Sequence, residues 1–125
     1  MVMTTDTITN VIDTYIAAWN ERVPERRRAL VAAAFADDAT YLDPMMSGAG
    51  GDELDALIAG AQDQFPGHRF VLHGAPDAHH DAVRFSWRLE PAAGGDAVAI
   101  GHDFGTLAGD GRLQRVVGFL EAPAA

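Results

Sequence analysis

Three strand-like segments occupy most of the last third of the chain, and an alternation of apolar and polar side chains in the first of them constrains the fold more than any other feature. The clearest run covers 82–90, where the apolar positions are Val83, Phe85, Trp87 and Leu89. Successive side chains of a strand point to opposite faces, so this run predicts a strand with one buried and one wet face. Two more strands are expected over 97–108 and 112–121. They meet at Asp110-Gly111, a strong hairpin signal, which favours an antiparallel meander.

The first 35 residues show a helical period instead. Apolar residues recur at i, i+3 and i+4 between Ile8 and Trp19, which predicts an amphipathic helix capped by Thr5 or Asp6. Pro24 suits the first turn of a second helix. The apolar stripe of that second helix is Leu30, Val31, Ala34 and Phe35.

A short strand and a third helix follow. The strand is expected over 39–43 and is ended by Pro44, and another strand is expected over 69–75. Asp52 is the expected cap of the third helix, and Pro66-Gly67 ends it. The buried side of that helix is expected to carry Leu54, Leu57, Ile58, Ala61 and Phe65. Helices followed by an antiparallel meander predict a single α+β domain over 1–125, with 122–125 as a frayed tail.

The charge of the chain argues against several partners. Its formal net charge is −9, which repels both nucleic acid and anionic membrane surfaces. The one basic cluster, Arg26-Arg27-Arg28, has glutamates nearby and is interpreted as a solvated helix face. The chain has no cysteine, no apolar run that could span a bilayer and no signal-peptide pattern at its start. These features fit a protein of the reducing cytoplasm.

Two acidic residues and a tyrosine are the candidate site. Asp43 ends an apolar strand, and Asp103 lies in the middle of a strand, where aspartate is disfavoured. Counting by two, Asp103 shares its face with alanine and glycine, which predicts a space above it that a ligand could fill. Burial there would raise the pKa of the Asp103 carboxyl. Tyr15, on the apolar side of the first helix, would join Asp103 in an oxyanion hole, with Asp43 as a separate base.

Each of these residues also has a structural interpretation. A mid-strand aspartate often faces water, a tyrosine at helical spacing often belongs to the core, and an Asp-Pro pair often forms a turn. Trp19 and Trp87 either line a pocket or fill the core. The five histidines show no ligand spacing, and the chain has no nucleophile elbow or phosphate loop, so neither a metal site nor a cofactor is expected.

Several segments together resemble a known family. They are 15–20 (YIAAWN), 34–40 (AFADDAT), Leu42-Asp43-Pro44 and the stretch from Gly101-His102-Asp103-Phe104 to Gly118-Phe119-Leu120. The chain resembles the nuclear transport factor two-like domains, also called SnoaL-like, and most of all the Δ5-3-ketosteroid isomerases. The resemblance implies a cone-shaped, cystatin-like fold in which three N-terminal helices pack on a strongly curved, mainly antiparallel sheet around a deep pocket.

The resemblance also implies roles for individual residues. Tyr15 falls on the isomerases' oxyanion-hole tyrosine, Asp43 on their catalytic base and Asp103 on their protonated acid. The apolar positions that would contact substrate are Phe85, Trp87, Leu89 and Leu120, with Trp19 as a further candidate. The implied ligand is a small apolar molecule of steroid or polyketide type.

Three functions are compatible with this pattern. The first is a cofactor-independent isomerase or cyclase that moves a proton α to a carbonyl. The second is a ligand-binding domain without turnover. The third is epoxide hydrolysis, which ranks last because its Arg-x-Asp pattern is missing from this sequence. Val98, Ile100 and Phe104 would leave an apolar patch on the outer sheet face, so a homodimer through that face is expected.

Overall fold

Three helices and one sheet make up residues 4–121, the part of the chain that the computed structural model describes. The helices are α1 (Thr5–Asn20), α2 (Pro24–Ala34) and α3 (Gly51–Gln64). The strands are β1 (Phe35–Leu42), β2 (Ser47–Ala49), β3 (His68–Leu72), β4 (Asp77–His79), β5 (Ala82–Pro91), β6 (Ala99–Leu107) and β7 (Leu113–Glu121). The expected frayed tail, 122–125, lies outside the described residues.

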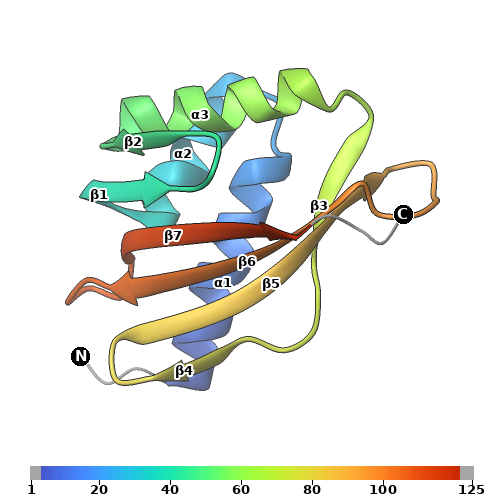
Figure 1. Cartoon of the computed structure of the whole chain (residues 1–125). Coiled ribbons are helices and arrows are strands. Elements are labelled where there is room, and N and C mark those ends of the chain that lie inside the picture. The colour runs from blue at the N-terminus through green and yellow to red at the C-terminus, as the bar shows by residue number, and fades with distance from the viewer. Residues whose placement is uncertain (1–3, 122–125) are drawn as a thin grey trace.

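The sheet is curved, and the helices cover one of its faces (Figure 1). Its strands follow the order β2-β1-β7-β6-β5-β3, and β4 pairs with β5 beside this path. Strands β1 and β7 run parallel, and every other described pair is antiparallel. The α+β class and the curved sheet predicted from the sequence are therefore confirmed.

The predicted meander has the expected strands and the expected faces. The four apolar residues of β5 are all buried, and β5 pairs with β6 with Phe85 opposite Asp103. The turn between β6 and β7 contains Gly111 at a φ of +88°, a conformation that favours glycine. Side chains of directly paired residues point to the same face of a sheet, and Phe85 is buried. Asp103 therefore lies on the buried face too, as do Gly101 and Gly105, which lie two residues before and after it in β6.

Both predicted helix caps were wrong. Thr4 caps α1, since its hydroxyl accepts a hydrogen bond from the Thr7 N–H at 3.1 Å. The cap of α3 is Gly50, at a φ of +82°, and Asp52 lies inside the first turn. Asp52 still favours this helix, because acidic residues in the first turn interact well with the helix dipole.

The interpretation of the three consecutive arginines was wrong for Arg27. This residue is buried on the side of α2 that faces α3, and its Nε donates to Asp55 Oδ1 at 2.7 Å. Its Nη1 donates to Gln62 Oε1 at 3.2 Å, and the Gln62 amide in turn donates to the carbonyl oxygens of Trp19 and Glu21. A buried polar network therefore joins the three helices.

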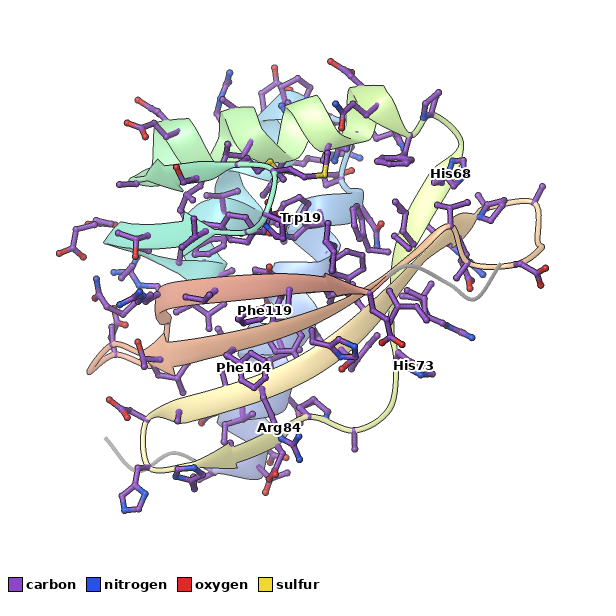
Figure 2. All side chains as sticks on the ribbon, in the orientation of Figure 1. Trp19, His68, His73, Arg84, Phe104 and Phe119 are labelled. Atoms are coloured by element: carbon purple, nitrogen blue, oxygen red, sulfur yellow. The ribbon has the colours of Figure 1, made fainter. Side chains whose placement is uncertain are left out.

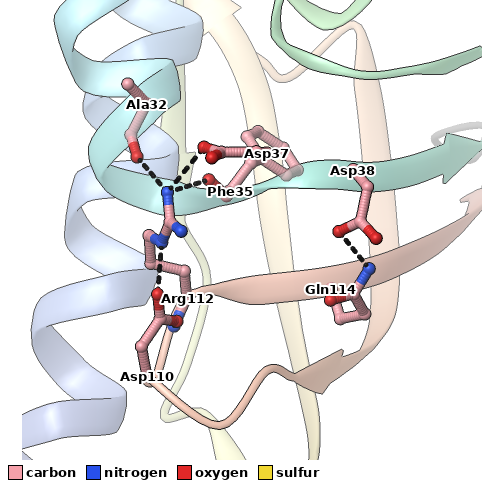
Figure 3. A network of polar contacts seen from close by, with 7 residues as sticks. All are labelled: Ala32, Phe35, Asp37, Asp38, Asp110, Arg112 and Gln114. Atoms are coloured by element: carbon pink, nitrogen blue, oxygen red, sulfur yellow. Dashed lines mark hydrogen bonds and ion pairs between the residues drawn. The ribbon is translucent and has the colours of Figure 1, made fainter.

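Arg112 ties the β6–β7 hairpin to the junction of α2 and β1 (Figure 3). Its guanidinium donates to the carbonyl oxygens of Ala32 and Phe35, to the Asp37 carboxylate and to the Asp110 carboxylate, over 2.8–3.2 Å. These contacts hold β7 beside β1, the one parallel pair among the described strands.

Candidate functional site

A cavity of about 370 Å³ lies between α1, α3 and the concave face of the sheet. This volume falls within the range of pockets that hold small organic ligands. Its wall is mostly apolar and is made by Tyr15, Ile16, Trp19, Tyr41, Asp43, Met45, Met46, Ala56, Leu57, Gly60, Ala61, Gln64, Phe65, Phe70, Trp87, Leu89, Ala99 and Leu120. Asp43 is the one acidic residue among these lining side chains.

Asp43 is held in place by the turn that follows β1. Its Oδ1 accepts hydrogen bonds from the backbone N–H groups of Met45 and Met46 at 2.8 and 3.0 Å. Its Oδ2 accepts the hydroxyl proton of Tyr41 at 2.6 Å. Asp43 therefore forms the turn and also lines the cavity. The bonds that form the turn hold its half-buried carboxylate in one orientation at the cavity wall.

Asp103 forms a second, more deeply buried polar group. Its Oδ2 accepts two hydrogen bonds, from the Tyr15 hydroxyl at 2.7 Å and from the Trp87 indole N–H at 3.1 Å. Its Oδ1 has no hydrogen-bond partner among the described residues. Burial raises the pKa of Asp103 to about 6, the bonds from Tyr15 and Trp87 lower it, and the nearby Asp43 raises it. Its charge therefore changes close to neutral pH.

Two glycines make room for this arrangement. A Cβ at Gly101 would overlap the Trp87 indole, so the predicted space above the alanine and glycine face is filled by Trp87 at this point. A Cβ at Gly118 would lie 2.8 Å from Asp103 Oδ1, 3.3 Å from Asp43 Cβ and 3.6 Å from the Tyr41 hydroxyl. The two carboxyl groups and Tyr41 thus gather around the bare backbone of Gly118, although they come from different strands.

The two tyrosines connect the acids to the cavity. Both line the cavity, and each donates its proton to one aspartate. Burial is the main reason why the pKa of Tyr15 and the pKa of Tyr41 lie well above the usual value. Tyr41 was not among the site residues predicted from the sequence. Its signal was its position two residues before Asp43, because residues two apart in a strand share a face.

The structure places the predicted contact residues in two groups. Trp19, Trp87, Leu89 and Leu120 line the cavity, together with Tyr15 and Asp43. Phe85 does not line it and instead packs edge-on against Tyr15, with ring centroids 5.1 Å apart, in the core. Asp103 lies behind Tyr15 and Trp87 and does not line the cavity itself. The prediction that Asp103 directly faces an open space was therefore wrong.

No three histidine or acidic side chains within residues 4–121 gather closely enough to hold a metal ion. The described helices also include none that is long and apolar enough to cross a membrane.

Comparison with known proteins identifies one family. A model of the SnoaL-like domain matches residues 12–116. The chain is also similar to the crystal structure of a candidate isomerase of the SnoaL-like family from Agrobacterium tumefaciens. The two share 47% sequence identity and a TM-score of 0.88 over 94% of this chain and 100% of that chain. No protein with a curated description matches the sequence.

Two more distant structures share the fold alone. One is a candidate SnoaL-like polyketide cyclase from Jannaschia sp., at 17% identity and a TM-score of 0.68, with 97% of this chain and 92% of that chain covered. The other is a protein with a cystatin-like fold from Methylobium petroleophilum, at 17% identity and a TM-score of 0.77, with 100% of this chain and 82% of that chain covered.

Proposed function

We propose that this chain, which belongs to the SnoaL-like domain family, binds a small carbonyl compound in its cavity and moves a proton next to the carbonyl group. The observation that carries this proposal is the position of Asp43. A single carboxylate, fixed by two backbone N–H groups and Tyr41, lines an otherwise mainly apolar cavity. A fixed carboxylate beside an apolar ligand is suited to general-base catalysis.

In the proposed reaction, Asp43 takes a proton from the carbon α to the carbonyl. The electron pair of the broken C–H bond forms the enolate, and the negative charge moves to the carbonyl oxygen. Asp43 then returns the proton at a conjugated carbon, which gives an isomerase. In a cyclase, the enolate carbon instead attacks a second carbonyl of the same substrate. The π electron pair of that C=O bond moves to its oxygen, which then takes the proton held by Asp43. Neither route needs a cofactor.

The Tyr15–Asp103 pair is proposed to stabilise the enolate oxygen from behind the cavity wall. With Asp103 ionised, the Tyr15 proton points at Asp103. Once Asp103 is protonated, its O–H can donate to the Tyr15 oxygen, which frees the phenol proton to turn into the cavity. Because the pKa of Asp103 is about 6, this form is populated at mildly acidic pH.

The Asp43→Asn variant tests the proposed base. We expect its turnover to fall about 100-fold to 10,000-fold, because the amide cannot accept the α-proton. The assay follows conversion of a Δ5-3-ketosteroid to its conjugated enone, and α-hydrogen exchange of 1-tetralone in D2O covers smaller substrates. Asp38→Asn is the matched control, since Asp38 is an exposed acid of β1, the strand that leads into Asp43. Equal turnover in the wild type and Asp43→Asn would contradict the proposal.

The alternative is a binding domain without turnover. The mostly apolar cavity favours it equally, because binding needs only the wall and a few polar groups. The same assays separate the two functions. If wild-type protein binds these ketones but catalyses neither enone formation nor α-hydrogen exchange, the binding function stands and the enzymatic one is rejected.

We also propose that the chain forms a homodimer through the outer face of its sheet. Phe104 and Phe119 project from this face (Figure 2), are 47% and 55% exposed, and stack edge-on with centroids 5.8 Å apart. Burying this pair would remove an apolar patch from water. We expect a dimer mass by sedimentation equilibrium and a monomer mass for Phe119→Asp. A monomeric wild type would contradict this proposal.

A further inference from the structure

The cavity covers only part of the concave face of the sheet. Directly paired residues of neighbouring strands form cross-strand rows, and the side chains of one row point to the same face. In the row of Leu89 and Ala99, both residues line the cavity. In the next row on this face, Trp87 is paired with Gly101, and only Trp87 of the two lines the cavity. The row after that contributes no lining residue, and its members are Phe85, Asp103 and Gly118.

The Trp87 indole stands at this boundary and is held there on three sides. It lies over the backbone of Gly101, where a Cβ would overlap the ring. Its N–H donates to Asp103 Oδ2 at 3.1 Å, so the nitrogen edge of the ring is directed at the row beyond the cavity. Phe70 packs edge-on against it, with ring centroids 5.1 Å apart. The ring cannot turn aside without leaving a buried polar group unpaired, which costs free energy.

Behind the indole the sheet offers mostly bare backbone. Gly101 lies directly under the ring, and Gly118 is the residue of the next row on β7. Neither glycine has a side chain that could form a second wall if the indole were smaller. The next side chain in that direction is Asp103, which the indole separates from the cavity. The length of the cavity along the sheet therefore depends on the size of one side chain, that of Trp87.

We propose that Trp87 is a specificity-determining residue that sets how long a ligand the cavity accepts. The inner end of the ligand rests against the indole and does not reach Asp103. This inference rests on the proposed function, because it limits the size of the same carbonyl ligand. It narrows the ligand class to carbonyl compounds whose apolar body fits between the mouth of the cavity and Trp87. Each methylene buried there adds affinity, whereas the excess of a longer body stays in water and adds none.

A series of unbranched 2-alkanones, from 2-hexanone to 2-dodecanone, measures this length. Isothermal titration calorimetry on the full chain gives the dissociation constant of each member. For the wild type we expect the affinity to rise about fourfold with each added methylene, the equivalent of about 0.8 kcal/mol. We expect this rise to stop at a limiting chain length, beyond which further methylenes leave the dissociation constant unchanged.

Two variants are expected to move the limiting length in opposite directions. Trp87→Leu opens the space over Gly101, so chains beyond the wild-type limit again gain about fourfold per methylene. Gly101→Ala places a methyl group where the indole lies and pushes the ring into the cavity, so the limit moves to shorter chains. Phe85→Leu is the matched control. Phe85 is a buried aromatic residue of the same strand and face that does not line the cavity, so its variant is expected to keep the wild-type limit.

An unchanged limit in either Trp87→Leu or Gly101→Ala would overturn the inference. An equal shift in Phe85→Leu, or no binding of any 2-alkanone to the wild type, would overturn it too. If a variant does not fold, nuclear Overhauser effects in the wild type decide. We expect them between protons of the bound ligand and the Trp87 ring, and none between the ligand and the Phe85 ring. Contacts with the Phe85 ring would show that the ligand passes the indole.

These readouts measure binding and need no turnover. A shifted limit in Trp87→Leu together with full turnover in Asp43→Asn would support the role of Trp87 and reject Asp43 as the base. An unchanged limit together with loss of turnover in Asp43→Asn would do the reverse.

Discussion

Replacing Arg27 with methionine is expected to lower the free energy of unfolding by about 3–5 kcal/mol, the usual cost of leaving one buried charge without its partner. Methionine preserves most of the side-chain volume, so the loss reports on the charge. Asp55 is only 8% exposed in the wild type, and the substitution removes its 2.7 Å bond from Arg27 Nε. Its nearest remaining cation is Arg28, whose Nε lies 3.7 Å from Asp55 Oδ2. Urea denaturation at pH 7 measures the change.

Two further variants show whether the buried pair is the cause. Arg26→Met changes an exposed arginine of the same helix and is expected to stay within about 0.5 kcal/mol of the wild type. The double variant Arg27→Met, Asp55→Leu removes both charges and is expected to recover much of the lost stability. Similar losses for Arg26→Met and Arg27→Met, or no recovery in the double variant, would contradict this explanation.

Raising the pH from about 4 to 7 is expected to destabilise the wild type by about 2 kcal/mol relative to Asp103→Asn, most of the about 3 kcal/mol that the full pKa difference represents. The pKa of Asp103 rises from 3.8 in the unfolded chain to about 6 in the fold, and each unit corresponds to about 1.36 kcal/mol. The folded state holds this proton more tightly, so the stabilisation is complete below pH 3.8 and is lost as the pH passes through 6. Asparagine does not titrate, and its amide oxygen can still accept from Tyr15 and Trp87.

The comparison is made by urea denaturation of both proteins at several pH values from 4 to 7. Acidic residues that do not interact with Asp103 contribute equally to both curves, so the difference reports on Asp103 and on its interaction with Asp43. Asp110 provides a control of the opposite sign, because bonds from Arg112 lower its pKa and its contribution is lost as the pH falls. If the free energies of unfolding of the wild type and Asp103→Asn change in parallel with pH, Asp103 has the same pKa in the folded and unfolded states, which would contradict the prediction.

Much of the fold could be predicted because its signals are local. The alternation in β5 and the hairpin glycine at 111 depend on neighbouring residues and on the geometry of a single strand. The helix boundaries were less certain, since Thr4 and Gly50 replaced the expected caps. Capping depends on which side chain or backbone conformation completes the first turn, and several adjacent polar residues were suitable.

The candidate site was predicted in part. Tyr15, Asp43 and Asp103 were chosen as polar residues in apolar surroundings, and the structure brings all three close together. Their connections were not predicted. Tyr15 and Asp103 are 88 positions apart, and nothing in either segment indicates that the phenol proton would be directed at the acid rather than at the cavity.

The sequence by itself determined the class of the fold, the buried face of each long strand and the identity of the unusual acids, because side-chain periodicity and hydrophobic burial follow from local order. Tertiary structure alone decided which polar groups are paired. The sequence around Arg27 predicts a solvated side chain, but in the fold α3 places Asp55 beside it. The sequence around Gly101 predicts an open space, but in the fold the Trp87 indole fills it. The cost of burying a polar atom depends on its partners, and these partners come from distant parts of the chain.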